Sequence, residues 1–181
     1  MKLKRAKHLL LLALFSTSPL FSQSEPSSED YQVYSAFLLI QLNGRRGIDD
    51  LRVGKNASTL SPDIAWSNKQ ISRKELLDVK ERLPGIEPEV LDSLSECTSK
   101  SYRLSRKLML PSEYTLIDPD RGTGPRGYIE FSCVGMNRSK TQAAFYVSRL
   151  RCDCAVGKWI LMSKDSNGHW AVVKESIVFI A

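Results

Sequence analysis

The cysteines are the residues of this sequence whose type and spacing point most clearly to chemistry. Two of them stand one residue apart in Cys152-Asp153-Cys154, with Arg149 and Arg151 just before them. A disulfide within Cys-x-Cys closes a very small ring, and strain makes such a bond easier to reduce. Neighbouring guanidinium groups lower the pKa of a thiol and favour the thiolate. These residues predict a thiol–disulfide exchange site as one candidate. A structural staple between strands is the alternative, because no thioredoxin-like βαβ pattern surrounds the motif.

Other catalytic templates are missing from the sequence. It contains no Gly-x-Ser-x-Gly elbow, no His-Glu-x-x-His, no phosphate-binding glycine loop and no cysteine pairs at zinc-finger spacing. His169 is the only histidine after residue 24, and its position beside the turn Ser166-Asn167-Gly168 is typical of a strand start. We therefore expect no metal, no cofactor and no catalytic histidine.

The N-terminus predicts export. Basic residues lie within the first seven positions, an apolar run covers 9–15, and small residues gather at Ser22-Gln23-Ser24. This is the layout of a secretory signal peptide, and the apolar run is too short to span a bilayer. We expect residues 1–24 to be a signal peptide, 25–30 a polar leader and 31–181 one domain, in a periplasmic or secreted protein.

The positive charge of the chain belongs mostly to that signal. Four of the 26 Lys and Arg residues lie within positions 1–24 and none of the 20 acidic residues does, which leaves 22 basic and 20 acidic residues, a net +2. The main argument for binding nucleic acid or an anionic membrane is thereby lost. We expect an envelope or extracellular partner, no nucleic acid, and no membrane span once the signal is cleaved.

The C-terminal third has the pattern of an antiparallel meander. Four runs rich in apolar, β-branched and aromatic residues, separated by polar turns, cover 128–135, 142–151, 157–164 and 169–180. If Asp165 to Gly168 closes the last hairpin, Trp170 pairs with Ser163 and Val172 with Leu161. Alternation in the first run gives the sheet an apolar face, and that face needs helices to cover it.

The meander also limits the disulfide pairings. With a turn near Arg138 and Ser139, Cys133 lies opposite Ala144, and Cys152 is eight residues further along that strand, about 26 Å away. Cys133 therefore pairs with neither Cys152 nor Cys154 and is predicted to be a buried thiol. Two pairings remain open, namely Cys97 to the hairpin tip and a local link between Cys152 and Cys154.

The first half of the chain has helical patterns. Apolar spacing predicts a helix from Tyr31 to Leu42 that ends at Gly44-Arg45-Arg46-Gly47, followed by a candidate short strand over 48–53. A capping box at Ser72-Arg73-Lys74-Glu75 predicts a helix ending at Pro84-Gly85, and Pro88 begins another that runs to about Cys97. We expect an α+β fold, with N-terminal helices packed on one face of a four-stranded antiparallel meander. Strands around 102–117 are a candidate extension of that sheet.

Four segments carry a resemblance to a known family. They are Phe131-Ser132-Cys133-Val134-Gly135-Met136-Asn137, Thr141-Gln142-Ala143-Ala144-Phe145-Tyr146-Val147, Gly157-Lys158-Trp159-Ile160-Leu161-Met162 and Gly168-His169-Trp170-Ala171-Val172-Val173-Lys174. This part of the chain resembles an uncharacterised family of exported bacterial proteins with a signal peptide, a helical first half and a C-terminal sheet. The resemblance implies that fold and no assigned activity. In those proteins the loop cysteines are usually further apart than in Cys152-Asp153-Cys154.

Together these patterns favour a non-catalytic exported binding or interaction module. The competing hypothesis is a thiol–disulfide redox protein that uses Cys152 and Cys154. Domains built from helices and a sheet often enclose a cone that accepts a small ligand, which is an argument from fold alone. Trp66, Trp159 and Trp170 are candidates for a binding surface, with ordinary packing as the alternative.

Overall fold

The structure is a computed structural model. It describes residues 25–52, 63–65, 71, 73–98, 104–105, 108–109, 116–117, 128–150 and 155–181. Cys152, Cys154, Trp66 and the predicted signal peptide lie outside these ranges.

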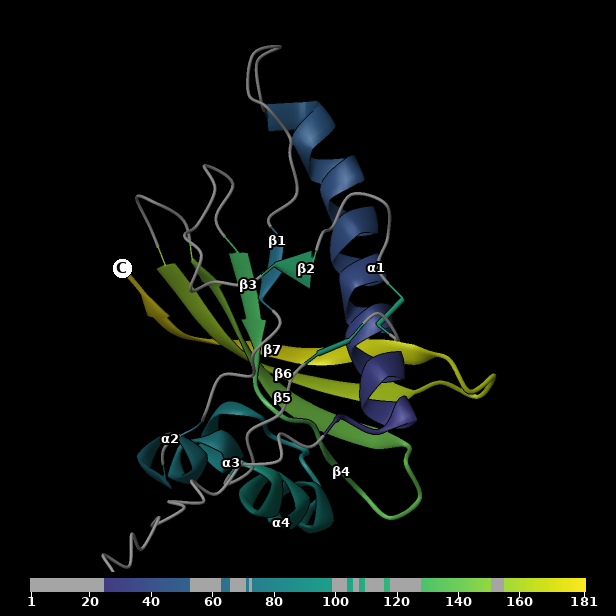
Figure 1. Cartoon of the computed structure of the whole chain (residues 1–181), viewed down its shortest axis with the longest axis vertical. Helices are drawn as coiled ribbons and strands as arrows, with labels where there is room; N and C mark the ends of the chain where they lie inside the picture. The colour runs from purple at the N-terminus through teal and green to yellow at the C-terminus, as the bar shows by residue number, and fades with distance from the viewer. Residues whose placement is uncertain are drawn as a thin grey trace, which may run out of the picture.

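The predicted C-terminal meander is confirmed. Its strands are β3 (Tyr128–Phe131), β4 (Gly135–Met136), β5 (Gln142–Leu150), β6 (Ala155–Lys164) and β7 (Trp170–Ile180). β3 and β4 are two pieces of the first predicted run, and both pair antiparallel with β5; β5 pairs with β6, and β6 with β7. The strands therefore lie side by side in the order in which they occur along the chain (Figure 1).

Two short parallel strands extend the sheet beyond β3. β1 (Asp63–Ala65) pairs with β3, and β2 (Leu116–Ile117) pairs with β1. Among the described residues of the candidate extension over 102–117, those of β2 form a strand. The described residues within 102–110 do not form a strand, because the backbone turns there, with Leu108 N–H donating to Ser105 O over 3.1 Å. Both Leu104 and Leu108 are buried.

The last hairpin is one residue out of the predicted register. Trp170 pairs with Lys164 instead of Ser163, and Val172 with Met162 instead of Leu161. The cause is the turn, in which Asp165 N–H donates to His169 O (2.9 Å), so that the loop holds only Ser166, Asn167 and Gly168. Gly168 has φ 81°, as the last residue of such a loop requires. The first hairpin differs as well, since Gly135 and not Cys133 lies opposite Ala144.

The N-terminal helix is longer than predicted at both ends. α1 (Ser28–Arg52) begins inside the expected leader, because Ser27 and Asp30 form a reciprocal cap: Ser27 Oγ accepts from Asp30 N–H, and Asp30 Oδ2 accepts from Ser27 N–H. It then continues through Gly44 and Gly47, so the predicted stop and the strand over 48–53 are wrong. A glycine inside a helix costs about 1 kcal/mol, which weakens a helix without ending it.

The short helices follow the predicted pattern closely. α2 (Arg73–Leu77) begins at the predicted capping box, and α3 (Val79–Arg82) continues it after a break at Asp78. α4 (Pro88–Cys97) has the predicted bounds, with proline in its first turn.

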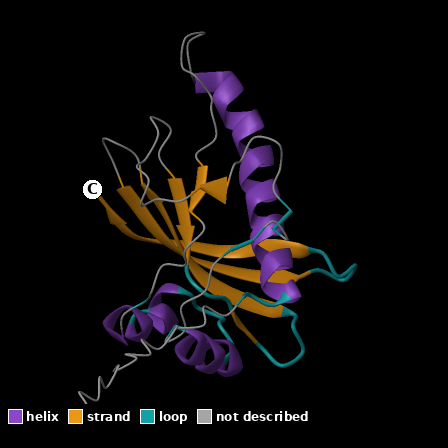
Figure 2. Cartoon of the chain, viewed as in Figure 1, coloured by secondary structure: helices purple, strands orange, loops and turns teal. Residues whose placement is uncertain are grey.

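Helices cover both faces of the sheet, not one (Figure 2). α1 packs on the face that carries Phe131 and Phe145, where Tyr34 stacks on Phe131 with ring centroids 4.7 Å apart. α4 packs on the opposite face at Gly135, the partner of Ala144. Every residue of β5 from Gln142 to Ser148 is consequently buried, and the core lies in two layers with β5 between them.

Candidate functional site

Cys97 is disulfide-bonded to Cys133. The bond joins the last residue of α4 to the connection between β3 and β4, with Cα atoms 6.0 Å apart. The prediction of a free Cys133 thiol is therefore wrong. Register arguments excluded partners on the neighbouring strand, but they could not place α4, which brings Cys97 to the sheet. The hypothesis of a redox site at Cys152 and Cys154 falls outside the described residues and stays a prediction.

The polar residues of the resemblance motif build the turn between β4 and β5. Asn137 is buried, and its Oδ1 accepts from the N–H groups of Thr141 (2.9 Å) and Gln142 (3.0 Å). Its Nδ2 donates to Glu87 Oε2 (2.9 Å), and Gln142 Oε1 accepts from Glu87 N–H (2.7 Å). These bonds fasten the start of α4 to the hairpin, so the motif's Asn and Gln have structural roles.

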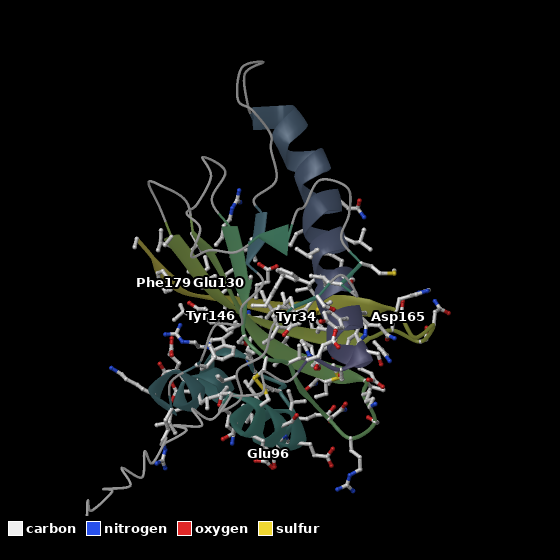
Figure 3. All side chains as sticks on the ribbon, viewed as in Figure 1. Tyr34, Glu96, Glu130, Tyr146, Asp165 and Phe179 are labelled. Atoms are coloured by element: carbon white, nitrogen blue, oxygen red, sulfur yellow. A yellow bond between two sulfur atoms is a disulfide. The ribbon has the colours of Figure 1, made fainter. Side chains whose placement is uncertain are left out.

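The small residues of the motif allow close packing. A Cβ on Gly135 would lie 2.5 Å from Val90 O and 2.6 Å from Leu94 Cβ, so only glycine lets α4 approach β4. Ser132 is fully buried, where its carbonyl accepts from Tyr34 Oη (2.5 Å) and its Oγ from Tyr146 N–H (2.8 Å). Figure 3 shows Tyr34 in the middle of the molecule, where this bond ties α1 to the sheet.

Tyr146 is the described side chain with the most strongly raised pKa. Burial, with added repulsion from the Glu75 and Glu130 carboxylates, raises the pKa of Tyr146 to about 12. The phenol is therefore neutral at physiological pH and unsuited to act as a general base. Gly157 leaves room for it, because a Cβ there would collide with the Tyr146 hydroxyl and the Phe179 ring.

His169 and the two described tryptophans have ordinary packing and turn roles. The His169 side chain is 81% exposed, and its backbone N–H donates to Asp165 Oδ1, which is the main reason that the pKa of Asp165 is lowered. Figure 3 shows Asp165 at the far end of the β6–β7 hairpin. Trp159 is fully buried, whereas Trp170 is half-buried, with Lys164 Nζ 5.0 Å from its ring centroid.

A cavity of about 210 Å³ lies between α1 and the sheet, and we call it the helix–sheet cavity. Its apolar lining comes from α1 and the three central strands: Phe37, Ile129, Val147 and Val156. Its polar lining consists of Gln41, Arg149 and Lys158. These polar residues were not predicted as a site, and the available signal was a cation inside an apolar strand, as in Gly157-Lys158-Trp159-Ile160.

Glu175 of β7 organises the polar end of the helix–sheet cavity. Its Oε2 accepts from Lys158 Nζ (2.8 Å) and its Oε1 from Gln41 Nε2 (2.9 Å). The side chains of Lys158 and Glu175 are 31% and 30% exposed, so the pair stands at the mouth of the cavity and not in its depth. A helix residue and two strand residues are thereby held in one fixed arrangement.

The described residues also line a groove and a cleft on the surface. A groove of about 550 Å³ runs between α1 and the β6–β7 hairpin, lined mainly by apolar atoms of Tyr31, Ala36, Leu39, Met109 and Trp170. A polar cleft of about 580 Å³ lies between α3 and β7, where Arg82 Nη1 also donates to Ile177 O.

β7 is the last strand of the sheet and carries exposed apolar side chains. Val173, Ile177 and Ile180 are at least half exposed. Two register shifts against β6 and the Arg82 contact interrupt the strand, and both features discourage pairing along a free edge.

Among the described residues, no cluster of three or more His, Cys, Asp or Glu could hold a metal ion. No helix in the described part of the chain has the length and apolarity needed to cross a membrane. No family model, curated protein or solved structure matches the chain.

Proposed function

We propose that the protein is a non-catalytic, exported binding module whose ligand enters the helix–sheet cavity. The observation that carries this proposal is the composition of the cavity. Its wall is apolar, and a few polar groups converge at one end, which is the usual make-up of a small-molecule site.

The arrangement of acids and bases supports binding over catalysis. Proton-transfer chemistry needs an acid or base of perturbed pKa in a cleft, facing the place where a substrate would lie. Among the described residues the two largest pKa shifts belong to Glu29, whose pKa is lowered to about 2 in an exposed ion pair with Lys140, and to Tyr146, whose pKa is raised to about 12. Tyr146 is neutral and packed against Gly157 in the layer opposite α1, and neither residue lines the cavity. The cavity itself is lined by cations, an amide and hydrocarbon.

Retention and turnover are distinguishable in one experiment. Mature protein spanning 25–181 is incubated with the small-molecule extract of its own cells and examined by native mass spectrometry. The control is Val156→Phe, which fills the cavity mouth. We expect a small molecule retained in one-to-one ratio by the wild type and absent from the variant. Conversion of an extract component by substoichiometric protein would instead establish an enzyme.

A further inference from the structure

We propose that the helix–sheet cavity takes a small monoanion with an apolar body, of which a straight-chain carboxylate is the simplest example. The inference rests on the proposed binding function and names the class of ligand.

The depth of the cavity is hydrocarbon. Phe37, Ile129 and Val147 are 4%, 5% and 7% exposed and belong to the core, so this wall is held in place by the packing behind it. A charged group placed there would lose its water without gaining a partner. An apolar chain gains about 0.8 kcal/mol for each methylene it buries. The inner end therefore selects the apolar part of a ligand.

The mouth of the cavity selects a negative charge. Arg149 and Lys158 are the only charged residues among the described ones that line it, and no carboxylate does. Among the described residues, the carboxylate that bonds to this lining is that of Glu175, which has one oxygen taken by Lys158 and the other by Gln41. An ammonium group has three donors, and Glu175 uses one, so Lys158 can also donate to a bound anion. A cationic ligand would meet no carboxylate among the described residues that line the cavity.

The size of the cavity limits the apolar part. A volume of about 210 Å³ lies below the range of about 300–1,000 Å³ that encloses drug-sized ligands. The ligand is therefore small, and a long lipid chain would not be enclosed.

Calorimetric titration with a homologous series tests the ligand class. Mature wild-type protein is titrated with straight-chain carboxylates from butanoate to dodecanoate, and with octan-1-ol as the uncharged analogue. We expect one-to-one binding whose affinity rises roughly fourfold for each methylene and then levels off when the cavity is full. The alcohol should bind at least about tenfold more weakly than octanoate, because it lacks the charge-assisted bond.

Matched variants locate the site. Lys158→Gln should lower octanoate affinity by about tenfold or more, because it removes a donor and exposes the anion to an unpaired Glu175. Lys164→Gln, on the same strand but at Trp170, should leave it unchanged. Val156→Phe should abolish binding. Circular dichroism and thermal unfolding check that each variant is folded.

The inference is overturned if no carboxylate binds saturably, or if Lys158→Gln and Val156→Phe bind octanoate like the wild type. Should carboxylates fail while the wild type still retains a different molecule that Val156→Phe does not, the ligand class is wrong and the binding function stands. If nothing is retained in either experiment, both proposals fail.

Discussion

At the scale of single residues, the motif that the sequence makes conspicuous serves the fold. Asn137, Gln142, Ser132 and Gly135 each hold a helix against the sheet, through hydrogen bonds or through the absence of a side chain. Val147 and Lys158 of the helix–sheet cavity belong to that motif, whereas Gln41, Ile129, Arg149 and Val156 of its lining lie outside it. A conspicuous sequence pattern is therefore a poor guide to the functional surface of this protein.

Removing the Asn137 side chain should destabilise the protein. Asn137→Ala leaves the buried N–H of Gln142 without its acceptor and frees the start of α4, so we expect a loss of about 2 kcal/mol in the free energy of unfolding. The loss is measured by urea unfolding, as a lower midpoint with an unchanged dependence of the unfolding free energy on urea concentration. The control Asn167→Ala, at an exposed turn, should stay within about 0.5 kcal/mol of wild type. Equal midpoints for the two variants would contradict the role given to Asn137.

Gly157 should not tolerate a methyl group. Gly157→Ala forces its Cβ into the Tyr146 hydroxyl and the Phe179 ring, and overpacking of this kind costs about 1–3 kcal/mol. Tyr146→Phe removes the hydroxyl, so the double variant should lose less stability than the two single variants combined. Strict additivity in that thermodynamic cycle would show that the two residues do not meet.

At the scale of elements, the Cys97–Cys133 disulfide joins the end of α4 to the residues that follow β3. Cys97 and Cys133 are 36 residues apart in sequence, and a closed loop of that length stabilises a protein by roughly 3–4 kcal/mol in the chain-entropy model. α4 is thereby fixed to the sheet both at its start, through Glu87, and at its end.

The Cys97→Ala/Cys133→Ala variant should lose roughly that 3–4 kcal/mol. Dithiothreitol should lower the urea midpoint of the wild type to about the midpoint of this variant. It should lower the midpoint of the Cys152→Ser/Cys154→Ser variant by as much as that of the wild type. It should leave the Cys97→Ala/Cys133→Ala variant unchanged. A remaining shift in that last variant would mean that Cys152 and Cys154 form a second stabilising bond, as the structural-staple alternative for these two cysteines predicts.

A pH-dependent ion pair links α1 to the β4–β5 hairpin. Lys140 Nζ donates a hydrogen bond to Glu29 Oε1 (2.5 Å), and this bond is the main reason that the pKa of Glu29 is lowered from 4.5 to about 2. Because the folded-state pKa is the lower one, the stability that Glu29 contributes is present above pH 4.5 and is lost as the pH falls toward 2.

Comparison with Glu29→Gln isolates this contribution. The wild type should be the more stable protein at neutral pH, and the difference in unfolding midpoint should vanish by about pH 2. Raised ionic strength should shrink the difference, since the pair is exposed. A difference that persists unchanged at the lowest pH would contradict the ion pair.

The elements that the sequence predicted well are those whose signals are local. Alternation and turn residues were enough for the order of strands, and proline at Pro88 was enough for the start of α4. Register depended on how Asp165 and His169 close the loop, and the length of α1 depended on the Ser27–Asp30 cap and on tolerance of Gly44. The Cys97–Cys133 bond depended on packing between elements far apart in the chain, which no local pattern contains.

At the scale of the whole molecule, the candidate site is a product of the fold. Lys158 of β6 and Glu175 of β7 meet through the pairing of these strands, and packing α1 across the sheet adds Gln41 to them. Each looks unremarkable in the sequence, where an isolated cation within an apolar strand indicates a solvent-facing position. Sequence analysis could therefore anticipate a cone between helix and sheet, but not its charge.

The most direct measurement is of intermolecular NOEs by NMR on protein spanning residues 25–181 bound to octanoate. Intermolecular NOEs should connect the terminal methyl of octanoate to the Phe37 ring and to the methyl groups of Ile129 and Val147, with the carboxylate end near Lys158. NOEs to Trp170 in the groove beside the β6–β7 hairpin, or none from a saturated sample, would contradict a ligand site between α1 and the sheet.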